Sequence, residues 1–262
     1  MKEKLNDQIK IVFFDIDHTL FDHKNGHFTS SSFKAMEKLH KKGVKFFLCT
    51  ARPYRSMMWL GPFARFNFDG FICVNGGLIN MNGKTIYADL INPDVVRKMI
   101  DFANKEKLTL EIMTDQDAYF ATPATNIALE FMKTWKETKP ILKSYHDENV
   151  TSMLLFSTVD NEDFLNSLPI YWHRFAKEGI DIYPHDLKKG KGIKIVLDKL
   201  GLNKENAMAF GDDLQDISMF LEVKYGIAMG NAKEEVKKSA YYVTKSIDKD
   251  GIYHAFKHFK LI

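Results

Sequence analysis

Polar residues follow several apolar runs of this sequence at the point where each run ends. They are Asp15 and Asp17 after residues 9–14, Thr50 after 44–49, Asn75 after 70–74, and Asp212, Asp213 and Asp216 after 207–210. A carboxylate at the end of a buried run is costly unless something binds it. Acids that meet repel each other unless a cation lies among them. The spacing therefore predicts a cation site.

The residue types indicate which cation and which reaction. Carboxylate oxygens select Mg²⁺ or Ca²⁺ rather than zinc, and Mg²⁺ with few carboxylates usually works with a phosphate. The Thr50 hydroxyl and the Lys191 ammonium suit phosphoryl oxygens, and Lys189 is the competing lysine. One Asp can be a nucleophile that forms an aspartyl-phosphate, and a second can be a general acid and base. We expect a Mg²⁺-dependent phosphoryl-transfer site.

Short apolar runs and amphipathic segments alternate at both ends of the chain, which predicts a doubly wound α/β domain with a parallel sheet. Ligands of such sheets bind beyond the carboxyl ends of the strands, where the polar residues stand. The predicted strands are Ile9–Phe14, Val44–Cys49, Gly70–Val74, Ala207–Phe210, Gly226–Met229 and Tyr241–Val243, and the predicted helices are Ser31–Lys42, Gly192–Leu200, Asp213–Leu221 and Lys233–Ala240.

The middle of the chain has a different pattern. Alternating strand-like segments and three helix candidates (94–105, 125–136 and 161–168) predict an inserted α+β module. We expect a catalytic core of residues 1–83 and 185–262 and an inserted α+β cap of residues 84–184, with turn-rich linkers at 80–84 and 184–192.

Composition limits the possible partners and the location. The net charge of +3 and the scattered lysines argue against nucleic acid as a partner, and no apolar run is long enough to span a membrane. The polar N-terminal stretch lacks the apolar region of a signal peptide. Cys49 and Cys73 lie in apolar runs, so buried thiols are expected. We expect a cytoplasmic monomer or small homo-oligomer.

Four segments together resemble the motifs of the haloacid dehalogenase superfamily of phosphatases: Asp15–Thr19 (DIDHT), Cys49–Arg52 (CTAR), Lys189–Gly192 (KGKG) and Gly211–Asp216 (GDDLQD). The tail 226–256 resembles the Cof-type branch, which has an inserted α+β cap. The resemblance covers about residues 9–82 and 185–262, whereas the cap match is architectural.

The resemblance implies a role for each matching residue. Asp15 would attack phosphorus and bind Mg²⁺, and Asp17 would offer its backbone carbonyl to Mg²⁺ and protonate the leaving group. The remaining residues are phosphoryl-binding Thr50, Ala51 and Lys191, metal-binding Asp212, supporting Asp216, Gln215 and Asp213, and Asn75 and Arg52 near the substrate. His18, Gln215 and Ala51 depart from the common pattern, in which Gly, Asn and Gly are usual.

Several residues keep a second interpretation. Asp213 can be a metal ligand or a helix cap, Arg52 can contact substrate or only pack, and His18 can be a turn residue or a proton-transfer group. The aromatic segment 170–176 is more typical of core than of a substrate platform. His23 and His27 have no motif support as a metal site.

Three functions use such a core. The first is hydrolysis of a small phosphorylated metabolite, such as a sugar phosphate or a phosphorylated cofactor. The second is a phosphomutase, which returns the phosphoryl group to a sugar. The third is a phosphoacceptor or metal switch, which is disfavoured because an acid–base residue beside the nucleophile speeds turnover and because a switch has little use for a lid.

Overall fold

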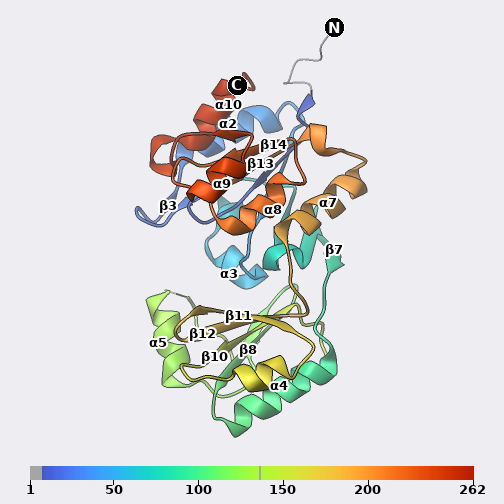
Figure 1. Ribbon diagram of the computed structural model, residues 1–262, viewed down its shortest axis with the longest axis vertical. Coiled ribbons are helices and arrows are strands. Elements are labelled where there is room, and N and C mark those ends of the chain that lie inside the picture. Colours follow the sequence, from blue (N-terminus) through green and yellow to red (C-terminus); the bar gives the residue numbers. More distant parts are fainter. Residues whose placement is uncertain (1–7, 136) are drawn as a thin grey trace. The chain divides into compact units, whose positions relative to one another are not determined.

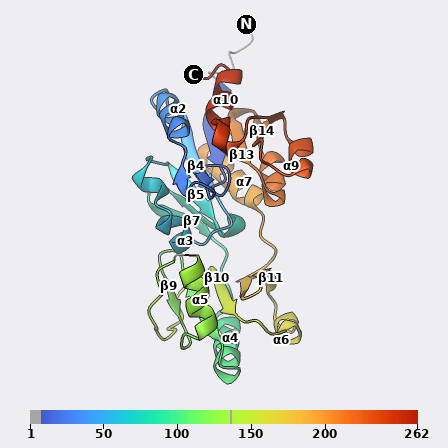
Figure 2. The ribbon, with the colours of Figure 1, turned by 90° about the vertical axis from the view of Figure 1, so that its left-hand side faces the viewer.

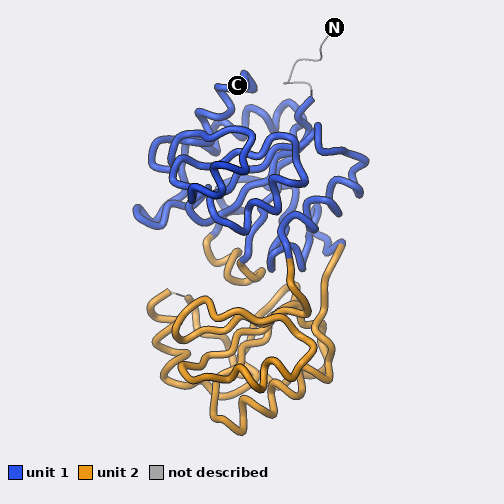
Figure 3. The backbone as a smooth tube through the Cα atoms, viewed as in Figure 1, with its two compact units in different colours: residues 1–51, 61–86, 188–262 blue, residues 52–60, 87–187 orange. Residues whose placement is uncertain are grey.

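The structure is a computed structural model that describes residues 8–135 and 137–262. Residues 1–7, on which the N-terminal prediction rests, and residue 136, at the end of a predicted helix, lie outside the described part. The chain forms two compact units (Figure 3): unit 1 comprises residues 1–51, 61–86 and 188–262, and unit 2 comprises residues 52–60 and 87–187. The sequence predicts the boundaries at 83/84 and 184/185, and it does not predict the segment 52–60 in unit 2.

Unit 1 is built on an eight-stranded sheet with the order β15-β14-β13-β1-β4-β5-β6-β7 (Figure 1). Its strands are β1 (Ile11–Phe14), β4 (Lys45–Cys49), β5 (Gly70–Cys73), β6 (Leu78–Met81), β7 (Lys84–Ala88), β13 (Ala207–Gly211), β14 (Tyr225–Ala228) and β15 (Tyr242–Val243). The strands from β15 to β5 pair in parallel, with β1 between β13 and β4. The six predicted strands are therefore present, each within two residues of its predicted ends.

The last two strands of this sheet form a hairpin. β6 runs antiparallel to β5, and β7 pairs with β6. The turn between them is Asn82–Gly83, both with positive φ, as a two-residue hairpin of the right twist requires. The sequence predicts residues 84–88 in the insertion, whereas in the structure they form the edge strand next to β6.

Helices cover both faces of this sheet (Figure 2). α2 (Ser30–His40) packs with α10 (Gly251–His258), and α7 (Lys189–Leu200), α8 (Ile217–Phe220) and α9 (Glu234–Ser239) follow one another on the other face. Phe14 stacks on Phe210 at 5.1 Å between ring centroids, and both rings meet Phe256 of α10 edge-on. Cys49 and Cys73 are free and buried, as predicted.

Unit 2 holds a five-stranded antiparallel sheet with the order β11-β12-β10-β8-β9. Its strands are β8 (Thr109–Met113), β9 (Ala118–Phe120), β10 (Ser152–Phe156), β11 (Tyr171–Ala176) and β12 (Gly179–Tyr183). Its helices are α3 (Tyr54–Trp59), α4 (Pro93–Lys105), α5 (Asn126–Thr134) and α6 (Glu162–Asn166). Apolar residues of α4 and α6 pack on one face of the sheet, and those of α5 pack on the other.

The remaining elements are short. Single 3₁₀ turns cover η1 (Pro62–Ala64), η2 (Val74–Gly76), η3 (Lys204–Asn206), η4 (Leu214–Asp216) and η5 (Ile247–Lys249), and β2 (Phe21–Asp22) pairs with β3 (His27–Phe28) in a small ribbon. Within the described residues, no helix combines the length and the apolar composition that crossing a membrane requires.

Candidate functional site

The acidic residues of unit 1 meet where the strand order of the sheet reverses. The chain passes from β1 to β4 on one side and returns to β13 on the other, so the carboxyl ends of β1 and β13 lie side by side. The Asp15 backbone N–H donates to Phe210 O at 3.0 Å. Carboxyl oxygens of Asp15, Asp212 and Asp216 lie within 4.8 Å of one another. The sequence predicted this convergence, because open α/β sheets bind ligands at such a point.

A buried lysine lies among these acids. Lys189 Nζ donates to Asp15 Oδ1 at 2.6 Å and to Asp216 Oδ1 at 2.7 Å, and Lys189 is 3% exposed. Lys191, which the sequence analysis chose for this position, is exposed. The choice of Lys191 is therefore wrong as a matter of geometry, and the competing lysine, Lys189, faces Asp15.

The reason lies in where α7 begins. The sequence predicts a helix from Gly192, with KGKG as a turn, but the helix begins at Lys189. A Cβ at Gly190 would lie 2.2 Å from Ser218 O, and one at Gly192 would lie 2.4 Å from the Ile72 side chain. The two glycines thus let the first helical turn pack closely on its neighbours, and this register turns Lys189 inward and Lys191 outward.

Asp216 shapes the loop after β13. Its Oδ2 accepts hydrogen bonds from the backbone N–H groups of Asp212 and Asp213, at 2.8 and 3.0 Å, while its Oδ1 holds Lys189. Asp213 caps η4 and forms an exposed ion pair with Lys233 at 2.8 Å, which favours the cap over the metal-ligand interpretation.

Asp212 and Gln215 differ in their surroundings. Thr19 Oγ1 donates to Asp212 Oδ1 at 2.8 Å, so the first and the last motif are joined directly. Gln215 is exposed, and only its backbone carbonyl has a described partner, the hydroxyl of Ser218. The structure therefore brings Asp212 into the acid cluster and leaves the Gln215 side chain outside it.

Burial and mutual repulsion dominate the electrostatics of the cluster. Burial raises the pKa of Asp15 well above its usual range, Lys189 opposes this rise, and Asp216, Asp17 and Asp212 add to it. Burial raises the pKa of Asp212 to about 7, although the Thr19 hydrogen bond lowers it. Burial disfavours the charge of Lys189, but the facing carboxylates raise its pKa well above its usual value. Burial thus leaves Asp15 and Asp212 with pKa values above the usual range of a carboxyl group, despite the nearby ammonium.

Asp17 contacts a residue to which the sequence analysis gave no role. His23, in the loop after β2, places Nε2 2.6 Å from Asp17 Oδ1. Both side chains are about one-third exposed. A histidine six residues after an acid is too common a pattern to reveal such a contact, because the contact depends on how the β2–β3 ribbon folds back.

The turn after β5 carries Asn75. Val74, Asn75 and Gly76 all have positive φ, and a Cβ on Gly76 would lie 2.4 Å from Lys188 O. The turn is fixed by a bond from Asn75 N–H to Thr50 O at 3.2 Å. Asn75 Oδ1 is buried without a hydrogen-bond partner among the described residues. This buried amide oxygen is therefore open to a donor from outside the described residues, such as a water or a ligand.

The residues after Thr50 divide between the two units. Thr50 is buried at the end of β4 in unit 1, and Ala51 is the last residue of that segment. Arg52 belongs to unit 2, where its Nη1 donates to Ser56 Oγ at 2.8 Å.

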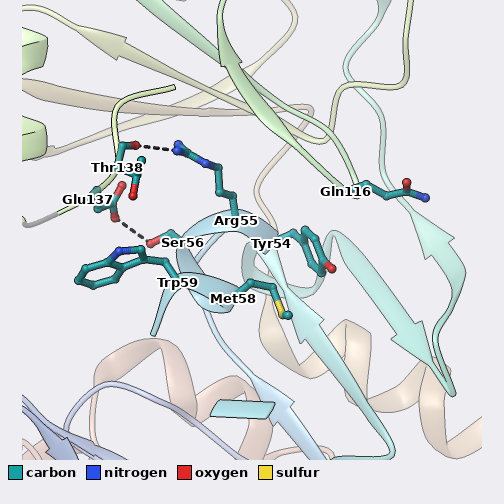
Figure 4. Close-up of a pocket in the computed structure, with 8 residues that line it drawn as sticks. All are labelled: Tyr54, Arg55, Ser56, Met58, Trp59, Gln116, Glu137 and Thr138. Carbon is teal, nitrogen blue, oxygen red and sulfur yellow. Dashed lines mark hydrogen bonds between the residues drawn. The ribbon is translucent and has the colours of Figure 1, made fainter. Parts of the chain in front are cut away.

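Unit 2 contains a pocket of about 330 Å³ (Figure 4). Ser56 Oγ donates to Glu137 Oε1 at 3.0 Å, and Arg55 Nη2 donates to Thr138 O at 2.6 Å. Glu111 of β8 is buried, and burial raises its pKa to about 8 although its Oε1 lies 3.5 Å from Arg55 Nη1. The pocket is lined by Tyr54, Arg55, Ser56, Met58, Trp59, Gln116, Glu137 and Thr138.

The acid cluster fits a divalent cation. Oxygens of three buried carboxyl groups converge, and burial raises the pKa of Asp15 and of Asp212, so a cation bound there would stabilise their charged forms. Asp216 already accepts bonds from Lys189 and from two backbone groups, so Asp15 and Asp212 are the carboxylates best placed to bind the ion. All-oxygen ligation favours Mg²⁺ or Ca²⁺.

Comparisons with known proteins agree with this geometry. A family model described as haloacid dehalogenase-like hydrolase matches residues 12–256. The chain is 30% identical to YkrA of Bacillus subtilis (strain 168), whose name provisionally marks it as a phosphatase, over 97% of this chain and 98% of the relative. It is 27% identical to YcsE of the same organism, named 5-amino-6-(5-phospho-D-ribitylamino)uracil phosphatase, over 97% and 96% of the two chains.

Among solved structures, the chain resembles the HAD subclass IIB sugar phosphatase BT4131. The two share 31% identity with a TM-score of 0.75, and the match covers 97% of this chain and all of the other. The predicted α/β core with a second α+β sheet is thus the fold of these relatives.

Proposed function

Because the chain belongs to the haloacid dehalogenase-like hydrolases and is an enzyme of the phosphatase type, we propose that it is a Mg²⁺-dependent phosphatase that hydrolyses a small phosphorylated metabolite through an aspartyl-phosphate. The observation that carries the proposal is Lys189, buried between Asp15 and Asp216 at 2.6 and 2.7 Å. At the reversal of the strand order, the buried lysine offers a positive charge to an anion. The acids beside it offer oxygens to a cation.

The reaction divides between Asp15, Asp17 and Lys189. An Asp15 oxygen forms a bond to phosphorus as the ester P–O bond breaks, and Asp17 gives its proton to the departing oxygen. Asp17 then takes a proton from the water that attacks the aspartyl-phosphate, which restores both acids and releases phosphate. Lys189 neutralises phosphoryl oxygens and favours the ionised form of Asp15 by opposing the rise in its pKa.

Mg²⁺, when bound, would supply further positive charge to the phosphoryl group. Asp15 and Asp212 would hold it through side-chain oxygens and Asp17 through its backbone carbonyl. Thr50 and Ala51 would face the phosphoryl group, and Asn75 Oδ1, buried without a described partner, would accept a hydrogen bond from the substrate.

The pocket of unit 2 suits a small substrate that has an apolar face as well as polar groups. Its volume of about 330 Å³ suits a metabolite, and its Trp59 ring together with Arg55, Gln116 and Glu137 offers a flat apolar face and planar hydrogen-bonding groups. Such a lining suits the hydroxyl groups of a sugar phosphate or the polar ring of a phosphorylated cofactor. The sugar and ribitylamino compounds in the names of relatives have the same chemistry.

A screen of phosphorylated metabolites with Mg²⁺ tests the proposal. We expect release of inorganic phosphate from sugar phosphates or phosphorylated cofactors, and none from Asp15→Asn protein. A phosphomutase would instead convert a sugar phosphate into its isomer with little free phosphate, and a switch would retain a single phosphoryl group per chain. Either result in the wild type would replace hydrolysis.

A further inference from the structure

The β2–β3 ribbon places a histidine, His23, next to Asp17, the expected acid–base residue. His23 Nε2 lies 2.6 Å from Asp17 Oδ1, within hydrogen-bond distance. Asp17 begins a tight loop in which the N–H groups of Leu20 and Phe21 both donate to Ile16 O, at 2.9 and 2.7 Å. The chain reverses its direction within this loop, and the reversal places His23 beside Asp17.

The ribbon also fixes the start of its own turn. Asp22 is buried, and its carboxyl oxygens accept bonds from Lys24 N–H at 2.9 Å and from Asn25 Nδ2 at 2.6 Å. The Gly26 N–H donates to Asp22 O at 2.7 Å. The backbone on which His23 stands is therefore held locally, as a side chain that must point in one direction requires.

The His23 ring is packed between two other rings. Its centroid lies 4.9 Å from that of His18 and 4.9 Å from that of Phe21, the latter edge-on. Aromatic contacts of this kind restrict the orientation of a ring as well as burying it. The hydrogen bond to Asp17 and the two ring contacts together restrict the orientation of the imidazole.

His18 takes a conformation that favours glycine. Its φ is +59°, where a Cβ is disfavoured. Asn231 Nδ2 donates to His18 O at 2.9 Å, and Asn231 Oδ1 accepts from Ile247 N–H at 2.9 Å, so a distant loop keeps this backbone in place. A strained residue is retained only where its surroundings or its role require it, and the described role of this side chain is its contact with His23.

We propose that His23 is a positioning residue for general acid–base catalysis, which holds the Asp17 carboxyl group toward the leaving group while the His18 and Phe21 rings hold His23. This inference rests on the proposed phosphatase function. No bond is made or broken at His23, because the proton passes between Asp17, the leaving oxygen and water. His23 restricts the rotation of Asp17 about its side-chain bonds, and a misdirected acid transfers its proton poorly.

The test compares two esters that differ in their need for an acid. A primary alkyl phosphate needs a proton on its leaving oxygen, whereas p-nitrophenyl phosphate does not. We expect His23→Ala to lower kcat on the alkyl ester by roughly 10- to 100-fold, part of the 10²–10⁴-fold of acid–base catalysis, and on the aryl ester by less than about threefold. His23→Gln, whose amide can donate to Asp17, should recover most of the loss.

His27→Ala is the matched control. His27 is an exposed histidine of the same ribbon, and its described side-chain bond, at 3.2 Å, goes to Phe28 O rather than to an acid. This variant should resemble the wild type on both esters. Equal losses on both esters in folded His23→Ala, or no loss on the alkyl ester, would overturn the positioning role.

Crystal structures of the wild type and of His23→Ala test the same inference without relying on phosphatase activity. We expect one Asp17 rotamer in the wild type and several in the variant. The same single rotamer in both would refute the inference. A wild type that hydrolyses neither ester nor any screened metabolite would refute the proposed function instead, and the rotamers would still decide the role of His23.

Discussion

Replacing Lys189 by methionine should remove both activity and stability, whereas the same change at Lys191 should remove neither. Methionine keeps most of the apolar stem of lysine and deletes its charge. Lys189 is buried and bonded to two carboxyl groups, but Lys191 is exposed two residues along the same helix. The pair of variants therefore separates the two lysines that the sequence left in competition.

The expected loss of stability follows from the two bonds. Removing one partner of a buried ion pair costs about 3–5 kcal/mol, because the other partner stays buried without its counter-charge. The lower value of this range applies to Lys189→Met, because burial already raises the pKa of Asp15 and this carboxyl group can take up a proton when the lysine is lost. A loss of about 3 kcal/mol lowers Tm by roughly 6–12 °C at about 2–4 °C per kcal/mol. An exposed substitution such as Lys191→Met stays within about 0.5 kcal/mol.

Thermal unfolding should be followed in EDTA, so that no metal ion replaces the lost ammonium charge, and phosphate release should be measured with Mg²⁺. We expect kcat of Lys189→Met to fall by at least roughly 10²–10³-fold, the cost of deleting one group that stabilises transition-state charge. Lys191→Met should keep kcat within about threefold. A Lys189→Met protein with wild-type Tm and activity, or an inactive but folded Lys191→Met protein, would refute the assignment.

Three further outcomes follow from the acids. Asp15→Asn should abolish phosphate release while the protein stays folded, because the amide cannot attack phosphorus and Lys189 keeps its bond to Asp216; turnover by the folded variant would exclude Asp15 as the nucleophile. EDTA should abolish activity, Mg²⁺ should restore it, and excess Ca²⁺ should inhibit it. Asp212→Asn should raise the Mg²⁺ concentration that activity needs. Full activity in EDTA would show that the reaction needs no metal ion. The pKa of Glu111 is raised from 4.5 to about 8, so between these pH values the folded protein keeps a proton that the unfolded chain has lost. The free energy of unfolding should therefore fall by up to roughly 1.4 kcal/mol per pH unit between about pH 4.5 and 8. Glu111→Gln should make this dependence shallower in thermal unfolding, while Asp212, whose pKa is also raised, still contributes up to about pH 7. An unchanged slope would assign the dependence to other groups.

Much of the core was predictable because its signals are local. Apolar runs such as Ile11–Phe14 form strands covered on both faces, and the polar residue after each run must lie at the edge of the sheet. That rule alone brings Asp15 and Asp212 together, although they are almost 200 residues apart. The four motifs in order then indicate phosphoryl transfer, and the family match over residues 12–256 agrees with them.

The structure differs from the predicted unit boundaries at residues whose environment is set by distant contacts. Residues 84–88 alternate like a strand of the insertion, but the Asn82–Gly83 turn folds them back on β6, so they extend the core sheet. The segment 52–60 follows a core strand in sequence, yet α3 makes its polar contacts, Ser56 to Glu137 and Arg55 to Thr138, within unit 2. Strand propensity alone predicts neither the pairing of residues 84–88 with β6 nor the contacts of α3 within unit 2.

The sequence by itself thus determined the chemistry of this protein: which residue types end the strands, in what order, and which reaction they suit. Tertiary structure decided which of two lysines two residues apart faces Asp15. A helix turns about 100° per residue, so that choice depends on where α7 begins, and it begins at Lys189 because Gly190 and Gly192 pack against Ser218 and Ile72. The contact of His23 with Asp17 likewise depends on the return of the β2–β3 ribbon, since spacing along the chain does not specify distance in space.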